Sequence, residues 1–181
     1  MDKDKIDSLL YSRVNNYTDD KKKDEDSNYE NHYLEQYRMY LHIYNSTNDR
    51  ANKSNDFFLG LNTAIIGVLG YLETKNLTDN NSVIFIFAPF VGIAICYCWY
   101  QIIISYKNLN RTKFKVIHSI EERLPISLFK TEWELLGRGQ DESIYRKLSS
   151  VEKKIPIIFI VLYAVIFGMT LPWDLVSLFL K

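Results

Sequence analysis

The sequence contains only two cysteines, Cys96 and Cys98, and both lie inside a long apolar segment. Thiols in such a segment are small hydrophobic groups rather than disulfide partners or zinc ligands. The chain also lacks an excess of either charge, with 22 Lys plus Arg against 22 Asp plus Glu. We therefore expect no general nucleic-acid binding, which needs a basic surface. The N-terminus has no apolar core followed by small residues, so we expect no cleavable signal peptide.

Residues that carry chemistry are equally scarce. His32, His42 and His118 stand among Tyr, Leu and Ile positions, with no Cys or carboxylate at metal-ligand spacing, so we predict no metal site. The sequence shows no phosphate-binding loop, nucleophile elbow or pair of membrane carboxylates. We expect neither an enzyme nor a bound cofactor.

Three long apolar runs are the main feature of the sequence. They cover residues 57–72, 83–104 and 155–173, and no Asp, Glu, Lys or Arg lies inside them. The first run would rise roughly 24 Å as a helix, which is short of the ~30 Å hydrocarbon core, whereas the second is long enough to cross it. The sequence therefore predicts an all-α integral membrane protein with three transmembrane helices and a cytosolic helical layer.

The short polar loop between the first two runs makes residues 57–104 a transmembrane hairpin. The other predicted segments are a disordered charged tail (1–28), a cytosolic amphipathic and polar helix (29–56), a cytosolic helical region (105–154) and a C-terminal tail (174–181).

Helical spacing refines the polar segments. Tyr29, Tyr33, Tyr37, Leu41 and Tyr44 fall on one side of a helix, which we expect to pack against another helix; the alternative is an aromatic face at the membrane surface. Within the region 105–154 we expect three short helices. They would cover about 105–124, stopping at Pro125, then 129–136, ending at Gly137, and a third from near Asp141.

Positive charge predicts the orientation. Lys and Arg number nine in residues 1–56, one in 73–82, eleven in 105–154 and one after 173. Because positive residues stay on the cytoplasmic side, the N-terminus and the region 105–154 are predicted inside and the C-terminus outside. Lys107, Arg111 and Lys115 recur every four residues below the second run. They would meet anionic lipid headgroups, or simply reflect the positive-inside rule.

Polar and small residues inside the runs are the candidate functional positions. Asn62 and Thr63 lie near the middle of the first run, where an amide facing lipid would lack partners. They either bond to a neighbouring helix or, with Asn52 and Asn55 of the preceding polar stretch, line a pore. Small residues at close-packing spacing are Gly60, Ala64 and Gly67 on the first run and Ala88, Gly92 and Cys96 on the second.

Four segments of the sequence are distinctive: RANKSNDFFLGLNTA at 50–64, SYKNLNRTKFKVI at 105–117, EERLP at 121–125 and EWELLGRGQD at 132–141. In sequence, order and spacing they resemble the RipA family of octameric bacterial membrane proteins. The resemblance implies a ring in the bacterial cytoplasmic (inner) membrane. The hairpin followed by cytosolic helices is also similar, more weakly, to SLATT domains, from which the third span departs.

The resemblance supplies no reaction, and it implies structural roles for Arg50, Asn55, Glu132, Trp133 and Gly137. Trp133 would be buried under the cytosolic helices, Gly137 would lie at a helix cap, and Arg50 would pair with a carboxylate such as Glu132 or Glu134. Two functions follow as hypotheses. One is a homo-oligomeric ring enclosing a pore or vestibule; the other is a non-conducting scaffold whose cytosolic layer binds a partner protein.

Overall fold

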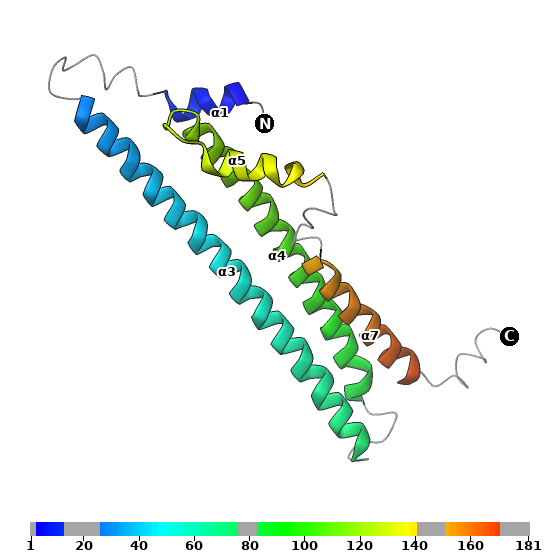
Figure 1. Ribbon diagram of the computed structural model, residues 1–181. Coiled ribbons are helices and arrows are strands. Elements are labelled where there is room, and N and C mark those ends of the chain that lie inside the picture. The colour runs from blue at the N-terminus through cyan, green and yellow to red at the C-terminus, as the bar shows by residue number, and fades with distance from the viewer. Residues whose placement is uncertain (1–2, 13–25, 76–82, 141–150, 171–181) are drawn as a thin grey trace. The chain divides into compact units, whose positions relative to one another are not determined.

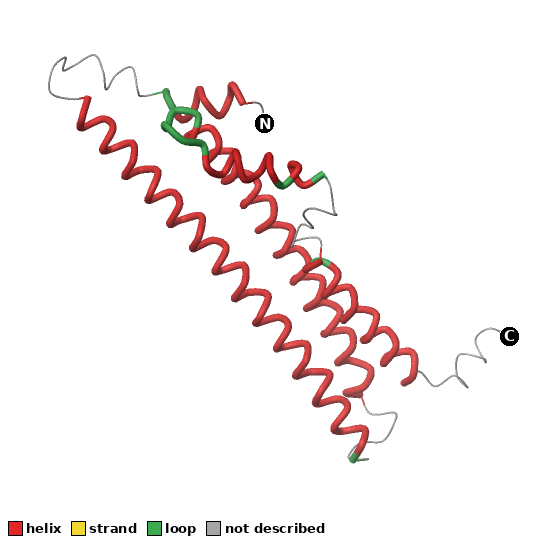
Figure 2. The backbone as a smooth tube through the Cα atoms, in the orientation of Figure 1, coloured by secondary structure: helices red, strands yellow, loops and turns green. Residues whose placement is uncertain are grey.

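The computed structural model describes residues 3–12, 26–75, 83–140 and 151–170, and every regular element within them is helical (Figures 1 and 2). The elements are α1 (Lys3–Leu10), α3 (Asp26–Thr74), α4 (Val83–Glu121), α5 (Leu128–Leu135), the 3₁₀ turn η1 (Gly137–Gly139) and α7 (Lys154–Thr170). The predicted all-α class is confirmed.

Helix α3 is a single helix of 49 residues. It joins the polar helix expected at 29–56 to the first apolar run at 57–72 without a break. The join is continuous because the polar stretch before the run contains neither glycine nor proline, the two residues that most often end a helix. One continuous helix therefore contains a polar segment followed by an apolar segment.

Helix α4 likewise joins the second apolar run to the polar helix expected from residue 105, in 39 residues. Pro89 lies inside this helix and is buried. A proline removes one backbone hydrogen bond, but the helix continues through it. The helix ends at Glu121, and a short loop that includes Pro125 leads into α5.

Helices α3 and α4 each contain a stretch long and apolar enough to cross a membrane, and α7 is a shorter apolar helix. The 17 residues of α7 rise roughly 26 Å, somewhat less than the ~30 Å hydrocarbon core. These three helices match the three predicted spans in position and are compatible with a membrane protein.

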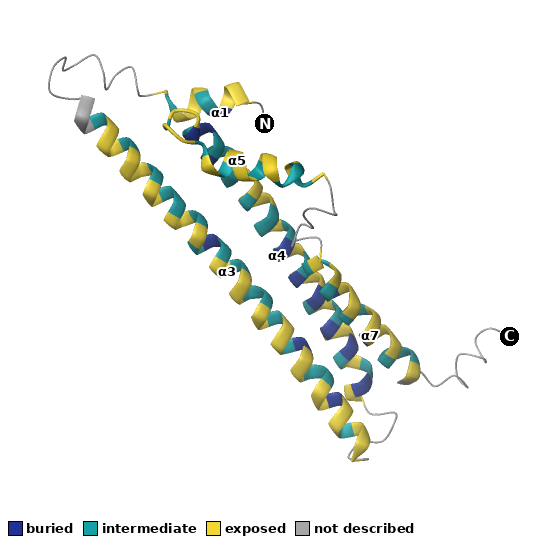
Figure 3. Ribbon diagram, viewed as in Figure 1, coloured by how far each residue is buried: buried dark blue, intermediate teal, exposed yellow. Residues whose placement is uncertain are grey.

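The chain forms two compact units. We name them the polar unit (Met1–Asp49 and Asn108–Arg146) and the apolar unit (Arg50–Lys107 and Lys147–Lys181). In the apolar unit the buried side chains gather on α4, which packs against α3 on one side and α7 on another (Figure 3). The outward faces of these helices are exposed and apolar, as expected for surfaces that meet lipid or other protein chains.

The polar unit is organised around the buried carboxylate of Glu121, which is 1% exposed. Its oxygens accept hydrogen bonds from the backbone N–H groups of Phe129 at 3.0 Å and Lys130 at 3.1 Å. These groups lie in the first turn of α5, so the last residue of α4 caps the next helix. The hydroxyl of Tyr37 on α3 donates to the same carboxylate at 3.3 Å. One side chain thus connects three helices.

Helix α1 lies within the tail 1–28 that we expect to be disordered. Ile6 is buried, and Lys3 forms an ion pair with Glu122 at 2.8 Å. Asp7 accepts a hydrogen bond from Ser119. These partners are more than a hundred residues away in the sequence, so local charge alone does not reveal the helix. Residues 13–25, the helix expected from Asp141 and the tail 174–181 lie outside the described residues.

Candidate functional site

A polar cluster lies at the centre of the apolar unit, where α3, α4 and α7 meet. The side chain of Asn62 on α3 is fully buried. Its Oδ1 atom accepts hydrogen bonds from Cys96 Sγ on α4 and from the Tyr163 hydroxyl on α7, each at 3.1 Å. Its Nδ2 atom donates to the carbonyl oxygen of Phe58 at 2.8 Å. The amide therefore has partners for both its donor and its acceptor within one protein chain.

The phenol of Tyr163 reaches Asn62 because Gly92 on α4 has no side chain. A Cβ atom built on Gly92 would lie 2.3 Å from Tyr163 Cζ, far inside the ~3.5–4.0 Å of an ordinary carbon contact. Both Gly92 and Tyr163 are buried. Of the small residues predicted to allow close packing on the second run, Gly92 and Cys96 thus serve the contact of α4 with α7 and α3.

A second interhelical contact lies about two turns along α3 from the first. Trp99 Nε1 donates to Asn55 Oδ1 at 3.0 Å, and the Trp99 ring is stacked on Phe58 with 5.9 Å between centroids. Phe159 of α7 lies 6.2 Å from the same ring. Two polar contacts in series therefore fix the rotation of α3 against α4, each contributing about 0.6 to 2 kcal/mol by analogy with other membrane helices.

The opposite side of α3 has no partner among the described residues of the protomer. Gly60, Ala64 and Gly67 are exposed, and a Cβ atom placed on either glycine meets nothing within 4 Å. Thr63 is also exposed, and its hydroxyl turns back to the carbonyl oxygen of Leu59 at 2.8 Å. The two stripes of small residues that look alike in the sequence therefore differ: one is filled inside the protomer and the other is open.

Asn52 and Asn55 line a small cavity of about 210 Å³ in the apolar unit, together with Asp56, Trp99 and Glu152. Burial raises the pKa of the Glu152 carboxyl above its ordinary value. The cavity places two carboxylates and two amides near the end of the apolar segment of α3. Among the described residues, however, no group of His, Cys, Asp and Glu is arranged to hold a metal ion.

The remaining predicted positions lie apart from this cluster. On α4, Arg111 is exposed, whereas Lys107 and Lys115 are half-buried. In the polar unit, Trp133 packs edge-on against Phe114, with 5.7 Å between ring centroids. Contact of the three basic residues with lipid headgroups stays a prediction.

The turn after α5, which lies in the segment EWELLGRGQD at 132–141, has unusual backbone geometry. Gly137, Arg138 and Gly139 all have positive φ, of 61°, 54° and 63°. The first of them follows the C-cap residue of α5, which is the position where glycine is favoured. Arg50 and Glu132 are exposed. Glu134, the other carboxylate considered for Arg50, forms its ion pair with Arg138 at 2.8 Å.

Three residues of these contacts were not candidates from the sequence: Tyr163, Trp99 and Glu121. Tyr163 is the only tyrosine in the run 155–173, and a hydroxyl at mid-span needs a partner, so a signal was present. Trp99 looks like a member of an interfacial aromatic belt, and only its contact with Asn55 distinguishes it. Glu121 stands in the family-like segment EERLP, but no local pattern predicts that it is buried.

Comparison with known proteins gives one positive result. The model of the octameric membrane protein family (8xMP) matches residues 34–172, which is most of the chain. No curated protein and no solved structure gave a match. The matched region begins within α3 and includes all three apolar helices and the polar residues between them. The chain therefore belongs to the octameric membrane protein family.

Proposed function

We propose that this protein forms a homo-octameric ring in the bacterial inner membrane, in which α3 faces the centre and encloses a conducting pore or vestibule. The observation that carries the proposal is the division of α3 into two sides. Asn62 and Asn55 are bonded to α4 and α7 partners within the protomer, whereas Gly60, Ala64 and Gly67 are open. A helix that lines a central passage needs one side bonded within its own protomer and another side left open toward the passage.

The open face continues into charged residues at one end. Lys53 and Asp56 are exposed and precede Gly60 by seven and four residues, so they lie on the same side of the helix. Charged residues at one end followed by small residues make a suitable lining for a water-filled passage. In this arrangement Thr63 belongs to the open surface, Asn52 is exposed beside the cavity that it shares with Trp99, and Asn62 positions α3 from behind rather than facing the pore.

The orientation of the protomer follows from charge. The polar unit contains most of the Lys and Arg residues, and the positive-inside rule places it in the cytoplasm. The N-terminus is then inside and the C-terminus outside, after three membrane crossings. Reporter fusions after Lys115 and after Thr170 test this directly, with cytoplasmic activity expected at the first and periplasmic activity at the second.

Conduction is tested with purified octamers in planar bilayers. We expect ion currents whose preference between cations and anions shifts toward anions in Asp56→Lys, because the substituted charge lies at the entrance. Glu30→Lys, an equal change of charge at an exposed position of the polar unit, is the control and should leave the selectivity unaltered. Silent bilayers under all voltages and salts, with intact octamers, would contradict conduction.

Exposed aliphatic side chains in the polar unit favour the second candidate function, a non-conducting scaffold for a partner protein. Ile126 and Leu128 are each 66% exposed and Leu135 is 76% exposed. Such side chains just before α5 and at its two ends are unusual on a surface that meets only water. Replacing all three with asparagine should abolish a stoichiometric co-purifying partner and leave the octamer intact; currents from octamers without any partner would count against this function.

A further inference from the structure

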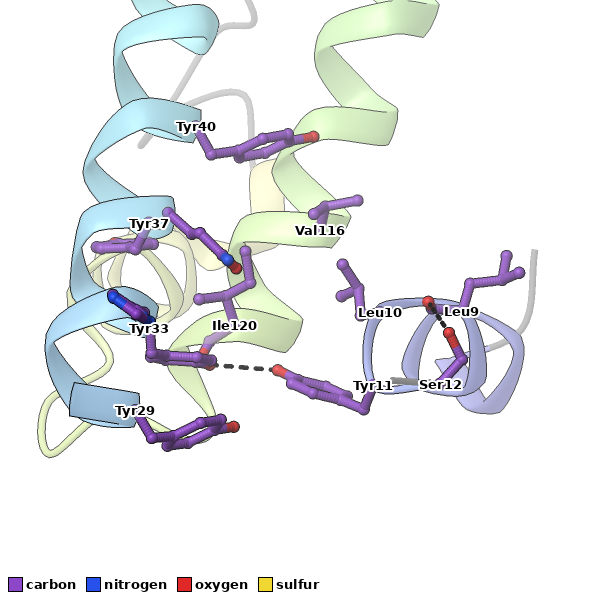
Figure 4. A pocket seen from close by; sticks show the side chains of 12 residues that line it. Leu9, Leu10, Tyr11, Ser12, Tyr29, Tyr33, Tyr37, Tyr40, Val116 and Ile120 are labelled. Carbon is purple, nitrogen blue, oxygen red and sulfur yellow. Dashed lines mark hydrogen bonds between the residues drawn. The ribbon is translucent and has the colours of Figure 1, made fainter. Parts of the chain in front are cut away.

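A tyrosine-lined pocket lies in the polar unit between α1, α3 and α4 (Figure 4). Its volume is about 450 Å³, within the range of cavities that bind small molecules. The lining includes Leu10 of α1 and Val116 and Ile120 of α4. Five tyrosines form most of the remaining wall: Tyr11, Tyr29, Tyr33, Tyr37 and Tyr40.

Several of these rings are held in place by their hydroxyl groups. Tyr33 donates to the carbonyl oxygen of Ile120 at 2.7 Å and lies 3.2 Å from the hydroxyl oxygen of Tyr11. Tyr37 donates to the buried Glu121 carboxylate at 3.3 Å. Figure 4 shows Tyr40 extending toward Val116 at one end of the pocket and the Tyr33 and Tyr11 pair at the other. The wall is therefore built before any ligand arrives, which lowers the entropic cost of binding.

The charges around the pocket indicate the kind of ligand. None of the described residues that line it is a Lys, Arg, Asp or Glu. A phosphate or carboxylate ligand would find no lysine or arginine in the lining, and its desolvation would be uncompensated. Tyrosine ring faces, by contrast, carry negative potential that attracts cations.

One ring of the wall already holds a cation. The Arg123 guanidinium lies over the Tyr11 ring, 3.2 Å from its centroid. The tyrosine ring faces are one source of negative potential, and the carboxylate of Glu121 is a second. This carboxylate accepts hydrogen bonds from neutral donors, namely two backbone N–H groups of α5 and the Tyr37 hydroxyl. Donation to that carboxylate pushes electron density into the Tyr37 ring, which strengthens its attraction for a positive ligand.

From these contacts we propose that the pocket binds a small organic cation of the quaternary ammonium class. Quaternary ammonium groups have no N–H to satisfy, so they lose less hydration on entering an aromatic pocket than a primary ammonium does. Their methyl groups also fit against the leucine, valine and isoleucine side chains between the rings. The proposal concerns the polar unit alone and does not depend on whether the assembly conducts.

The test is calorimetric titration of the full-length octamer in maltoside micelles or in nanodiscs free of choline lipids. Choline is the probe, and 3,3-dimethylbutan-1-ol is its uncharged isostere of nearly the same shape. We expect saturable binding of choline and at least tenfold weaker binding of the isostere. Equal affinities for the two compounds would show a merely apolar cavity, and no heat from either at millimolar concentration would show a cavity closed by protein; both results overturn the proposal.

Three variants of α3 examine the role of the rings. Tyr40→Leu should weaken choline binding at least fivefold, whereas Tyr40→Phe, which keeps the ring, should retain it. Tyr44→Leu changes a tyrosine one turn further along that does not line the pocket, and it should bind as the unaltered protein does. Retention of the octamer on gel filtration shows that each variant is folded. Unchanged affinity in a folded Tyr40→Leu octamer would contradict the proposal.

Discussion

Substitution of Gly92 by alanine tests whether α7 is held against α4 by a contact that admits no Cβ atom. The added carbon would lie 2.3 Å from Tyr163 Cζ and 2.5 Å from each Cε atom. Relief requires the ring to withdraw by more than 1 Å to reach an ordinary contact of about 3.5 Å. The ring cannot withdraw freely, because it is fully buried and its hydroxyl is bonded to Asn62 Oδ1.

The expected loss of stability combines two contributions. Overpacking of a close-packed site costs typically about 1–3 kcal/mol. The hydrogen bond to Asn62 that the ring gives up adds about 0.6 to 1.7 kcal/mol within a membrane helix bundle. We therefore expect Gly92→Ala to destabilise the protomer by roughly 2–4 kcal/mol, seen as a lower midpoint temperature for loss of the octamer in detergent.

A double-mutant cycle tests the close contact between Gly92 and the Tyr163 ring. Tyr163→Leu removes the ring, so Gly92→Ala should cost much less in that background, with a coupling energy of about 1–3 kcal/mol. Gly168→Ala on α7 is the matched control, because its Cβ atom would meet nothing within 4 Å. If Gly92→Ala were as harmless as Gly168→Ala, or if Tyr163→Leu gave no relief, the close contact of α4 with α7 would be wrong.

Three further perturbations probe other parts of the chain. Glu121→Gln should destabilise the polar unit by about 1–2 kcal/mol, because a carboxamide oxygen accepts both α5 amides less well than a carboxylate does, and thermal unfolding followed by circular dichroism measures this. Gly137→Ala should cost about 1–2 kcal/mol because a Cβ atom strains a residue with positive φ, whereas an octamer that melts at the unaltered temperature would contradict the left-handed turn. The ion pair with Lys3 lowers the pKa of Glu122 below its usual 4.5. The ion pair therefore stabilises the docking of α1 above pH 4.5, and this contribution is lost as the pH falls through the lowered pKa. We expect faster amide exchange in α1 at acid pH, and already at pH 7 in Glu122→Gln.

Much of the fold could be predicted from local features of the chain. The three apolar runs predict spans because a backbone in lipid must satisfy its own hydrogen bonds, and the helix does this within each segment. The positions of α5 and of the glycine after it follow from spacing and from the conformational freedom of glycine. The helix α1 could not be predicted in this way, because contacts with distant segments of the chain stabilise it.

Only part of the candidate site could be predicted from the sequence. Asn62 is conspicuous as an amide inside an apolar run, and both an interhelical bond and a pore lining satisfy its need for partners. The structure places Tyr163 on it, 101 residues away in the chain. Similarly, Gly60 and Gly92 belong to equivalent patterns in the sequence, but the Tyr163 ring covers Gly92, whereas none of the residues that the structure describes covers Gly60.

The sequence by itself determined that the chain is helical, that three segments are suited to lipid and that a mid-membrane amide must bond to something. Those properties depend on neighbours within one or two helical turns, where backbone hydrogen bonding and hydrophobicity act. Only the tertiary structure decided which side of α3 is used inside the protomer, which tyrosines share a pocket and which carboxylate caps α5. Those choices depend on side chains that lie far apart along the chain and meet only when the helices pack.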